Sequence, residues 1–122
     1  MEALELKLLM SPDVVGIEAG GGPADVESFC VLVQCLIGEP GPAADTFDVI
    51  VASPDRFAAA VPTDGGALSG RGYLVMRRWD GARVRETIAG WVAEASGAAD
   101  WPTAAAILCR SMFWELENDD IG

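Results

Sequence analysis

The chain has 122 residues, of which 51% are hydrophobic, and its 19 acidic and 8 basic residues give a formal net charge of −11 with no histidine. This length predicts one domain, residues 1–122, that buries roughly 65% of the surface exposed by its unfolded chain. The negative charge argues against nucleic-acid or anionic-lipid partners, and the lack of histidine excludes the commonest catalytic triads and the histidine metal sites.

Three cysteines, at positions 30, 35 and 109, lie inside apolar runs and lack the spacing of metal ligands. We therefore expect buried thiols in a reducing compartment. No charged segment followed by an apolar run opens the chain, and its longest apolar stretch is far shorter than the roughly 20 residues that span a bilayer. We expect a soluble cytoplasmic protein with no membrane partner, no metal and no cofactor.

The N-terminal part predicts a strand followed by a loop. Leu4, Leu6 and Leu8 alternate with charged residues, which predicts a half-buried strand over residues 3–9. Residues 13–27 contain a run of three glycines, but no Lys-Ser/Thr pair follows it and it does not have the spacing of a phosphate-binding loop. We interpret this segment as a flexible linker.

The most apolar run of the chain extends from Phe29 to Gly38 and contains one polar residue, Gln34. A strand with one wet face would show a polar residue at every second position, so we predict a central strand that is covered on both faces. A buried helical turn is the alternative, because periodicity does not separate the two structures in a short apolar run. The content of Val, Phe and Cys favours the strand.

The next segments predict two more strands. Residues 46–52 predict a third strand, which the turn-rich connection at 39–42 pairs with the second. Asp48 points to one face of this strand, and three apolar residues share the other: Phe47, Val49 and Val51. Residues 56–60 suit a short helical turn, and residues 73–79 predict a fourth strand.

From Asp80 the hydrophobic period changes from two to about 3.6 residues. Asp80 is a suitable N-cap for an amphipathic helix that ends at Gly97. Its apolar stripe contains Val84, Ile88, Trp91, Val92 and Ala95. Asp100 caps a second helix with Pro102 in its first turn, and alternation returns at 113–117.

Strands first and helices later predict an α+β fold. We expect a single domain with a mostly antiparallel sheet of four or five strands and two C-terminal helices packed on one face. The other face of the central strand then needs a cover. The 54–60 turn, the long loops or a partner molecule could supply it.

Carboxylates and one tryptophan are the candidates for a functional site. Glu115 with Glu117, or Asp119 with Asp120, could bind a cation or raise the pKa of one member of the pair, but such groups are usually only solvated in an acidic protein. The four tryptophans are expected to pack in the core. Trp114 is the tryptophan for which we question core packing, because an aromatic residue framed by carboxylates is typical of a site for a basic protein partner.

Six segments, taken in order, carry a resemblance to a known family. They are Ser-Pro-Asp at 11–13, Phe-Cys-Val-Leu-Val-Gln-Cys-Leu-Ile-Gly at 29–38, Phe-Asp-Val-Ile-Val-Ala-Ser-Pro at 47–54, Gly-Arg-Gly-Tyr-Leu-Val at 70–75, Asp-Trp-Pro-Thr-Ala-Ala at 100–105 and Phe-Trp-Glu-Leu-Glu at 113–117. In this order and spacing, from about Leu4 to Glu117, the chain resembles the immunity protein 8 family of bacterial polymorphic-toxin systems.

The resemblance implies a small α+β protein without catalytic activity that neutralises a cognate toxin by binding its C-terminal effector domain. Such domains are often nucleases with basic surfaces, which the charge of −11 would complement. The resemblance names no contact residues. From the residues themselves we predict one acidic face, Trp114, Glu115, Glu117, Asp119 and Asp120, and a second candidate patch, Asp45 and Asp48. We expect a monomer or a weak homodimer.

Two other functions remain open at this point. The protein could be a structural or adaptor subunit whose uncovered strand face joins a larger assembly, in which case it would self-associate independently of salt. It could also bind a small molecule or act as a carboxylate enzyme, which its apolar core would allow.

Overall fold

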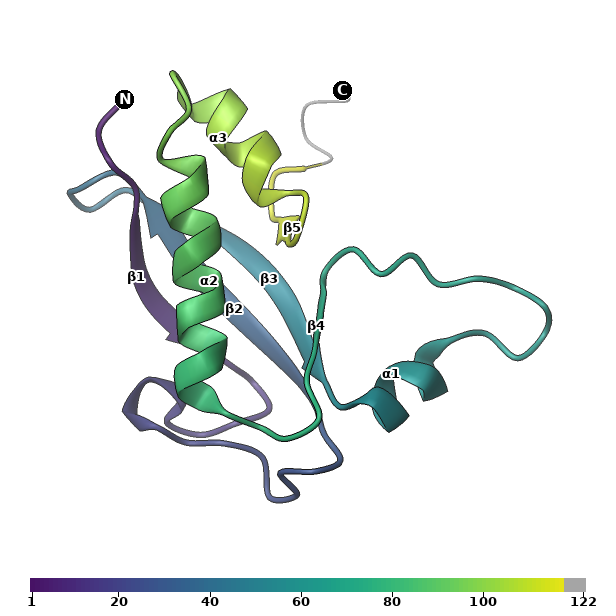
Figure 1. The fold of residues 1–122 in the computed structure, drawn as a ribbon. Helices are drawn as coiled ribbons and strands as arrows, with labels where there is room; N and C mark the ends of the chain where they lie inside the picture. The colour runs from purple at the N-terminus through teal and green to yellow at the C-terminus, as the bar shows by residue number, and fades with distance from the viewer. Residues whose placement is uncertain (118–122) are drawn as a thin grey trace.

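A five-stranded sheet carries the fold (Figure 1). The computed structural model describes residues 1–117. The strands are β1 (Glu5–Met10), β2 (Cys30–Gly38), β3 (Asp45–Ala52), β4 (Tyr73–Val75) and β5 (Phe113–Trp114). Their order is β1-β2-β3-β4, and β5 also pairs with β3. Only the β3–β4 pair is parallel among these, so the predicted, mostly antiparallel α+β sheet is confirmed.

The two C-terminal helices begin where the sequence places N-caps. The helices of the described residues are the 3-10 helix η1 (Ile17–Ala19) and the α-helices α1 (Pro54–Ala60), α2 (Gly81–Ala95) and α3 (Trp101–Leu108). The Asp80 carboxylate accepts a hydrogen bond from the Arg83 amide at 3.1 Å, and the Asp100 carboxylate accepts one from the Thr103 amide at 2.9 Å. Both predicted caps are confirmed, because each satisfies an amide of a first turn that has no partner within its helix.

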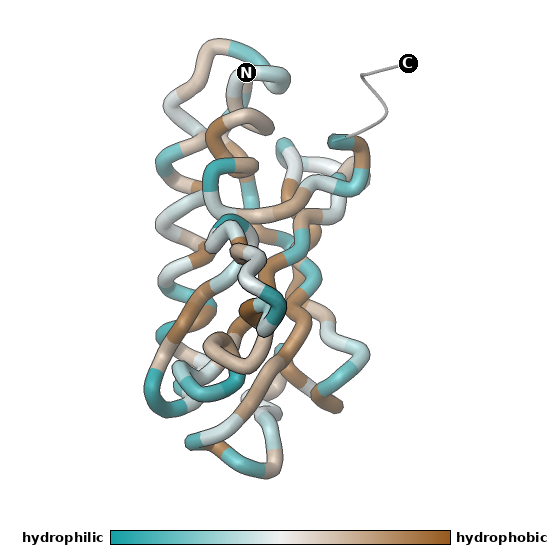
Figure 2. Tube along the Cα trace, turned by 90° about the vertical axis from the view of Figure 1, so that its right-hand side faces the viewer, coloured by the Kyte–Doolittle hydropathy of each residue, from teal (hydrophilic) through white to brown (hydrophobic). Residues whose placement is uncertain are grey.

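The hydrophobic core lies between the sheet and the two C-terminal helices, which cover the same face (Figures 1 and 2). Every second residue of β2 and β3 is buried there: Val31, Val33, Cys35, Ile37, Phe47, Val49 and Val51. The helices contribute Val84, Ile88, Val92, Ala95, Ala104, Ala105 and Leu108. Period-2 strands and 3.6-period helices therefore meet along one apolar seam, as the patterning predicts.

The alternation predicted for the first strand fails at its centre. The register of β1 against β2 shifts between Leu6 and Leu8. This bulge places Leu9 in the core at 4% exposure and turns Leu8 outward at 36% exposure. An extra residue in one strand reverses the facing of every residue after it, so Leu4, Leu6 and Leu8 do not share the core face.

The prediction that the central strand is covered on both faces is wrong. Gln34, Leu32 and Leu36 lie on the side of β2 away from the helices, and they are only half-buried. The helix α1 packs Phe57 against Tyr73 of β4, with ring centroids 5.0 Å apart, at the edge of the sheet. The sheet therefore has one face beneath the helices and one that we call the open face.

Two smaller expectations also need correction. Cys30 is exposed at the start of β2, so only Cys35 of the three cysteines is fully buried. The fourth strand ends at Val75 rather than at residue 79, because the chain then turns back over the core. There Trp79 packs edge-on against Phe29, with ring centroids 5.6 Å apart.

Candidate protein-binding surface

The pairing of β5 with β3 brings the two predicted acidic patches together. Trp114 lies opposite Phe47, and the next residue, Glu115, continues the ladder at Thr46. The Glu115 amide donates to the Thr46 carbonyl and the Thr46 amide donates to the Glu115 carboxylate, both at 3.0 Å. Asp45 and Asp48 therefore lie beside the C-terminal residues, although the sequence separates the two segments widely.

The sheet then divides these residues between its faces. Asp45 and Trp114 share the helix-covered face, where the Trp114 indole Nε1 donates to the Asp45 carboxylate at 3.0 Å. The Trp114 ring stacks on Phe47 at 6.0 Å between centroids and meets Trp101 edge-on at 6.3 Å. Trp114 thus packs against the core with its polar atom satisfied.

Asp48 and Glu115 lie on the open face. Asp48 pairs across the sheet with Gln34 on one side and with Phe113 on the other. Its Oδ1 atom is buried and accepts no hydrogen bond from the described residues. Burial, followed by the nearby negative charge of Glu115, raises the pKa of the Asp48 carboxyl above its ordinary value. Asp48 and Glu115 are therefore two like charges on the same face of the sheet.

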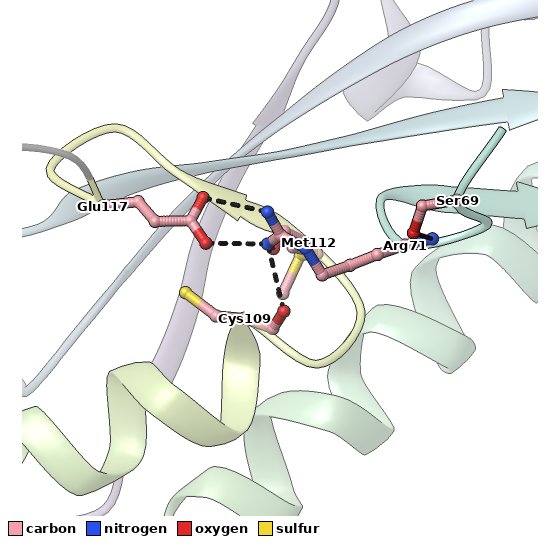
Figure 3. Close-up of polar contacts among 5 residues, drawn as sticks. All are labelled: Ser69, Arg71, Cys109, Met112 and Glu117. Atoms are coloured by element: carbon pink, nitrogen blue, oxygen red, sulfur yellow. Dashed lines mark hydrogen bonds and ion pairs between the residues drawn. The ribbon is translucent and has the colours of Figure 1, made fainter. Parts of the chain in front are cut away.

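Glu117 has a different environment, because Arg71 holds it (Figure 3). The Arg71 Nη1 atom lies 2.9 Å from Glu117 Oε1, and Nη2 lies 3.3 Å from Oε2. Nη1 also donates to the carbonyls of Met112 at 3.0 Å and Cys109 at 3.2 Å. Both carboxylate oxygens of Glu117 contact this guanidinium, so Arg71 compensates the charge of Glu117. We therefore assign Glu117 a structural role, which is to position Arg71.

Arg71 is the residue that sequence reasoning missed. Its guanidinium also lies 4.3 Å from the centroid of the Phe113 ring, so it joins the 62–72 loop to the segment after α3. The sequence offered one signal, the Gly-Arg-Gly segment at 70–72, where an arginine stands between glycines. Nothing local connects that segment with Glu117.

The last two residues of the predicted acidic face, Asp119 and Asp120, lie outside the described residues. The described part therefore places four predicted residues around the β3–β5 pair, and it places Glu117 in the Arg71 cluster. The β3–β5 group, Asp45, Asp48, Trp114 and Glu115, spans both faces of the sheet.

Two hollows flank this region. One, of about 290 Å³, lies between the β2–β3 loop and Trp101, with Asp45 and Glu39 in its lining. The other, of about 330 Å³, opens beside the open face and is lined by Ile50, Leu68, Ser69, Arg71, Tyr73 and Phe113. Both hollows are open to solvent rather than enclosed.

The charges of the open face are not balanced by arginines. The ion pairs within residues 1–117 are Arg71–Glu117, Arg78–Glu27, Arg83–Glu86, Arg85–Glu18 and Arg110–Glu94. None of them includes Asp48 or Glu115. Most of the basic side chains are therefore engaged elsewhere, and the two carboxylates on the open face have no ion-pair partner within residues 1–117.

Other kinds of site find less support in the described part of the chain. Across residues 1–117 there is no group of three or more Cys, Asp and Glu side chains that could hold a metal ion. Over the same residues, no helix has the length and apolar character needed to cross a membrane. The strongest chemical feature is the carboxylate pair on a partly apolar sheet face, which is suited to binding a protein.

Comparison with known proteins gives one family and no individual relative. Residues 6–119 match the family described as Immunity protein 8, which is nearly the whole chain. Neither the curated proteins nor the solved structures contain a match. The match joins β1, the core strands, both C-terminal helices and the β5 segment in one pattern. The chain therefore belongs to the immunity protein 8 family, which makes it an immunity protein of a toxin system with a toxin as its partner.

Proposed function

We propose that this immunity protein binds a basic effector domain of its cognate toxin, a nuclease, and blocks it by occlusion without catalysis. The observation that carries the proposal is that Asp48 and Glu115 share the open face at the β3–β5 pair, where no arginine or lysine forms an ion pair with them in the described chain. Membership of the family implies that the partner is a toxin, and the acidic surface supports a basic partner.

Charge also supports a kinetic role. The formal charge of −11 would attract a basic domain over several ångströms and orient it before contact. Electrostatic steering of this kind raises association rates to about 10⁸–10⁹ M⁻¹s⁻¹ at low salt. A nuclease needs a basic surface to hold its substrate, so an acidic protein on that surface would compete directly with nucleic acid.

The first test is a pull-down from the producing cell with tagged protein at low and high salt, followed by identification of the captured proteins. The captured toxin domain is then purified and assayed on DNA and RNA with and without the immunity protein. We expect a basic domain, capture that weakens as salt rises, and loss of nuclease activity at equimolar immunity protein. A neutral or acidic toxin domain, or binding that does not change with salt, would contradict the proposal.

A structural or adaptor role is the second candidate, and the exposed open face favours it. Phe113 is 38% exposed on that face and Leu8 is 36% exposed. In this case the protein would assemble through apolar contacts alone. Sedimentation at micromolar concentration would then show self-association or a stable complex that is equally strong at low and high salt.

A further inference from the structure

We propose that the toxin domain docks on the open face of the sheet and places a lysine or arginine against Asp48, with apolar side chains around it. This inference rests on the proposed function and specifies the contact surface and the chemistry of the segment that occupies it. The open-face residues that would contact the toxin are Leu8, Leu32, Gln34, Leu36, Asp48, Ile50, Phe113 and Glu115.

The register of the strands arranges this face in rows. Leu8, Leu36 and Thr46 form one row across β1, β2 and β3. The next row joins Met10, Gln34, Asp48 and Phe113, and the third joins Leu32, Ile50 and Tyr73. The polar pair Gln34 and Asp48 therefore lies between Leu8 and Leu36 of the first row and the apolar third row.

This arrangement has the anatomy of a protein interface. Leu8 and Phe113 are each more than a third exposed, and Leu32, Leu36 and Ile50 are half-buried on the side of the sheet away from α2 and α3. An apolar surface of this kind, with a few polar groups, is typical of a site that a partner covers. The other face already has its cover, because α2 and α3 close the core there.

The unbalanced charge of Asp48 determines what the partner must provide. Its Oδ1 atom is buried without a hydrogen bond from the described residues, and Glu115 adds a second negative charge beside it. No ion pair within residues 1–117 includes Asp48: Lys7 donates to the carbonyls of Gly41 and Ala43, and Arg71 binds Glu117. A cation from the partner beside this carboxyl group would offset its negative charge and that of Glu115.

The same charges argue against a second copy of the chain as the occupant. A two-fold dimer through the open face would place one Asp48–Glu115 pair near the other, with like charges in contact. Residues 118–122 add two aspartates and no lysine or arginine, so their charge has the wrong sign to neutralise this face. A basic segment of another protein is therefore the occupant that fits.

The experiment measures the affinity of the full chain for the purified toxin domain by calorimetric titration at one salt concentration. Asp48→Lys should weaken binding by roughly 100-fold, as expected when one partner of a buried charge pair is reversed. Leu8→Ser should weaken it by roughly tenfold through lost apolar contact. The control, Glu86→Lys, makes the same change in net charge on α2, which covers the opposite face, and should change affinity by less than about threefold.

Thermal unfolding of each variant shows whether it is folded. If Asp48→Lys fails to fold, Asp48→Asn replaces it, because it removes the charge with almost no change of volume, and it should still weaken binding by roughly tenfold. Equal loss in Glu86→Lys and Asp48→Lys would mean that only net charge matters and would overturn the inference. Full affinity in Asp48→Lys and Leu8→Ser would overturn it while the proposed function stands. Failure of the unaltered protein to bind the toxin domain would contradict both the proposed function and this inference.

Discussion

The guanidinium of Arg71 and the carboxylate of Glu117 form a two-point ion pair that joins residues 46 positions apart. The same guanidinium is hydrogen-bonded to two carbonyls after α3 and stacked on Phe113. Arginine suits this position because its planar fork donates in several fixed directions at once, which lysine does not. The cluster therefore fastens the long loop before β4 to the segment that forms β5.

Loss of this cluster should destabilise the protein. We expect Arg71→Met to lower the free energy of unfolding by about 1–2 kcal/mol, a value reduced because a third of each side chain is exposed. Urea unfolding followed by circular dichroism measures it. Arg78→Met is the matched control, because the Arg78–Glu27 pair is mostly exposed and should contribute less than about 0.5 kcal/mol. Equal effects in the two variants would show that the cluster has no special role.

Reversing the two glutamates of the C-terminal segment should separate binding from stability. Glu115→Lys should weaken toxin binding by roughly tenfold, because it removes one carboxylate of the open face and introduces a cation. Glu117→Lys should lower the melting temperature instead, because it places a cation beside Arg71. Affinity and thermal unfolding are measured for both variants. A loss of affinity in a stably folded Glu117→Lys protein would assign Glu117 to the contact surface as well.

Asp48 should make the native state less stable as pH rises. Its folded pKa is raised, so between the unfolded pKa near 3.8 and the folded pKa the native state holds more protons than the unfolded state, and stability falls through that window. Above the folded pKa, the charged Asp48 carboxylate lowers the free energy of unfolding by its full amount. Asp48→Asn should therefore be more stable than the unaltered protein at pH 7, with a difference that shrinks as pH falls toward 3.8. Unfolding free energies measured across this range test it, and a pH-independent difference would contradict it.

Gly72 should not tolerate a side chain. Its φ of +86° favours glycine, and an added Cβ would lie 2.0 Å from the ring of Phe113. We expect Gly72→Ala to cost about 2–4 kcal/mol from backbone strain and crowding together. Gly70→Ala is the control, because a Cβ there meets no atom within 4 Å. Thermal unfolding of both variants gives the comparison, and an unchanged melting temperature for Gly72→Ala would mean that Phe113 moves aside at little cost.

Local sequence patterns were sufficient to predict the helices and the core-facing side of the sheet. The helix caps at Asp80 and Asp100, the apolar stripe of α2 and the inward side of β3 follow from short-range rules, since N-caps and periodicity act within a few residues. The bulge in β1 does not follow from them. It changes the facing of Leu8 through pairing with β2, which no pattern within residues 3–9 records.

The sequence by itself determined the α+β class, the family to which the chain belongs and the acidic character of its surface, because composition, periodicity and the order of short segments are all local properties. Only the tertiary structure decided where the predicted site residues lie. Pairing of β5 with β3 brought Asp48 and Glu115 together on the open face and placed Trp114 against the core. Glu117 instead forms an ion pair with Arg71. Side chains alternate between the faces of a sheet, so neighbours in sequence separate and distant residues meet.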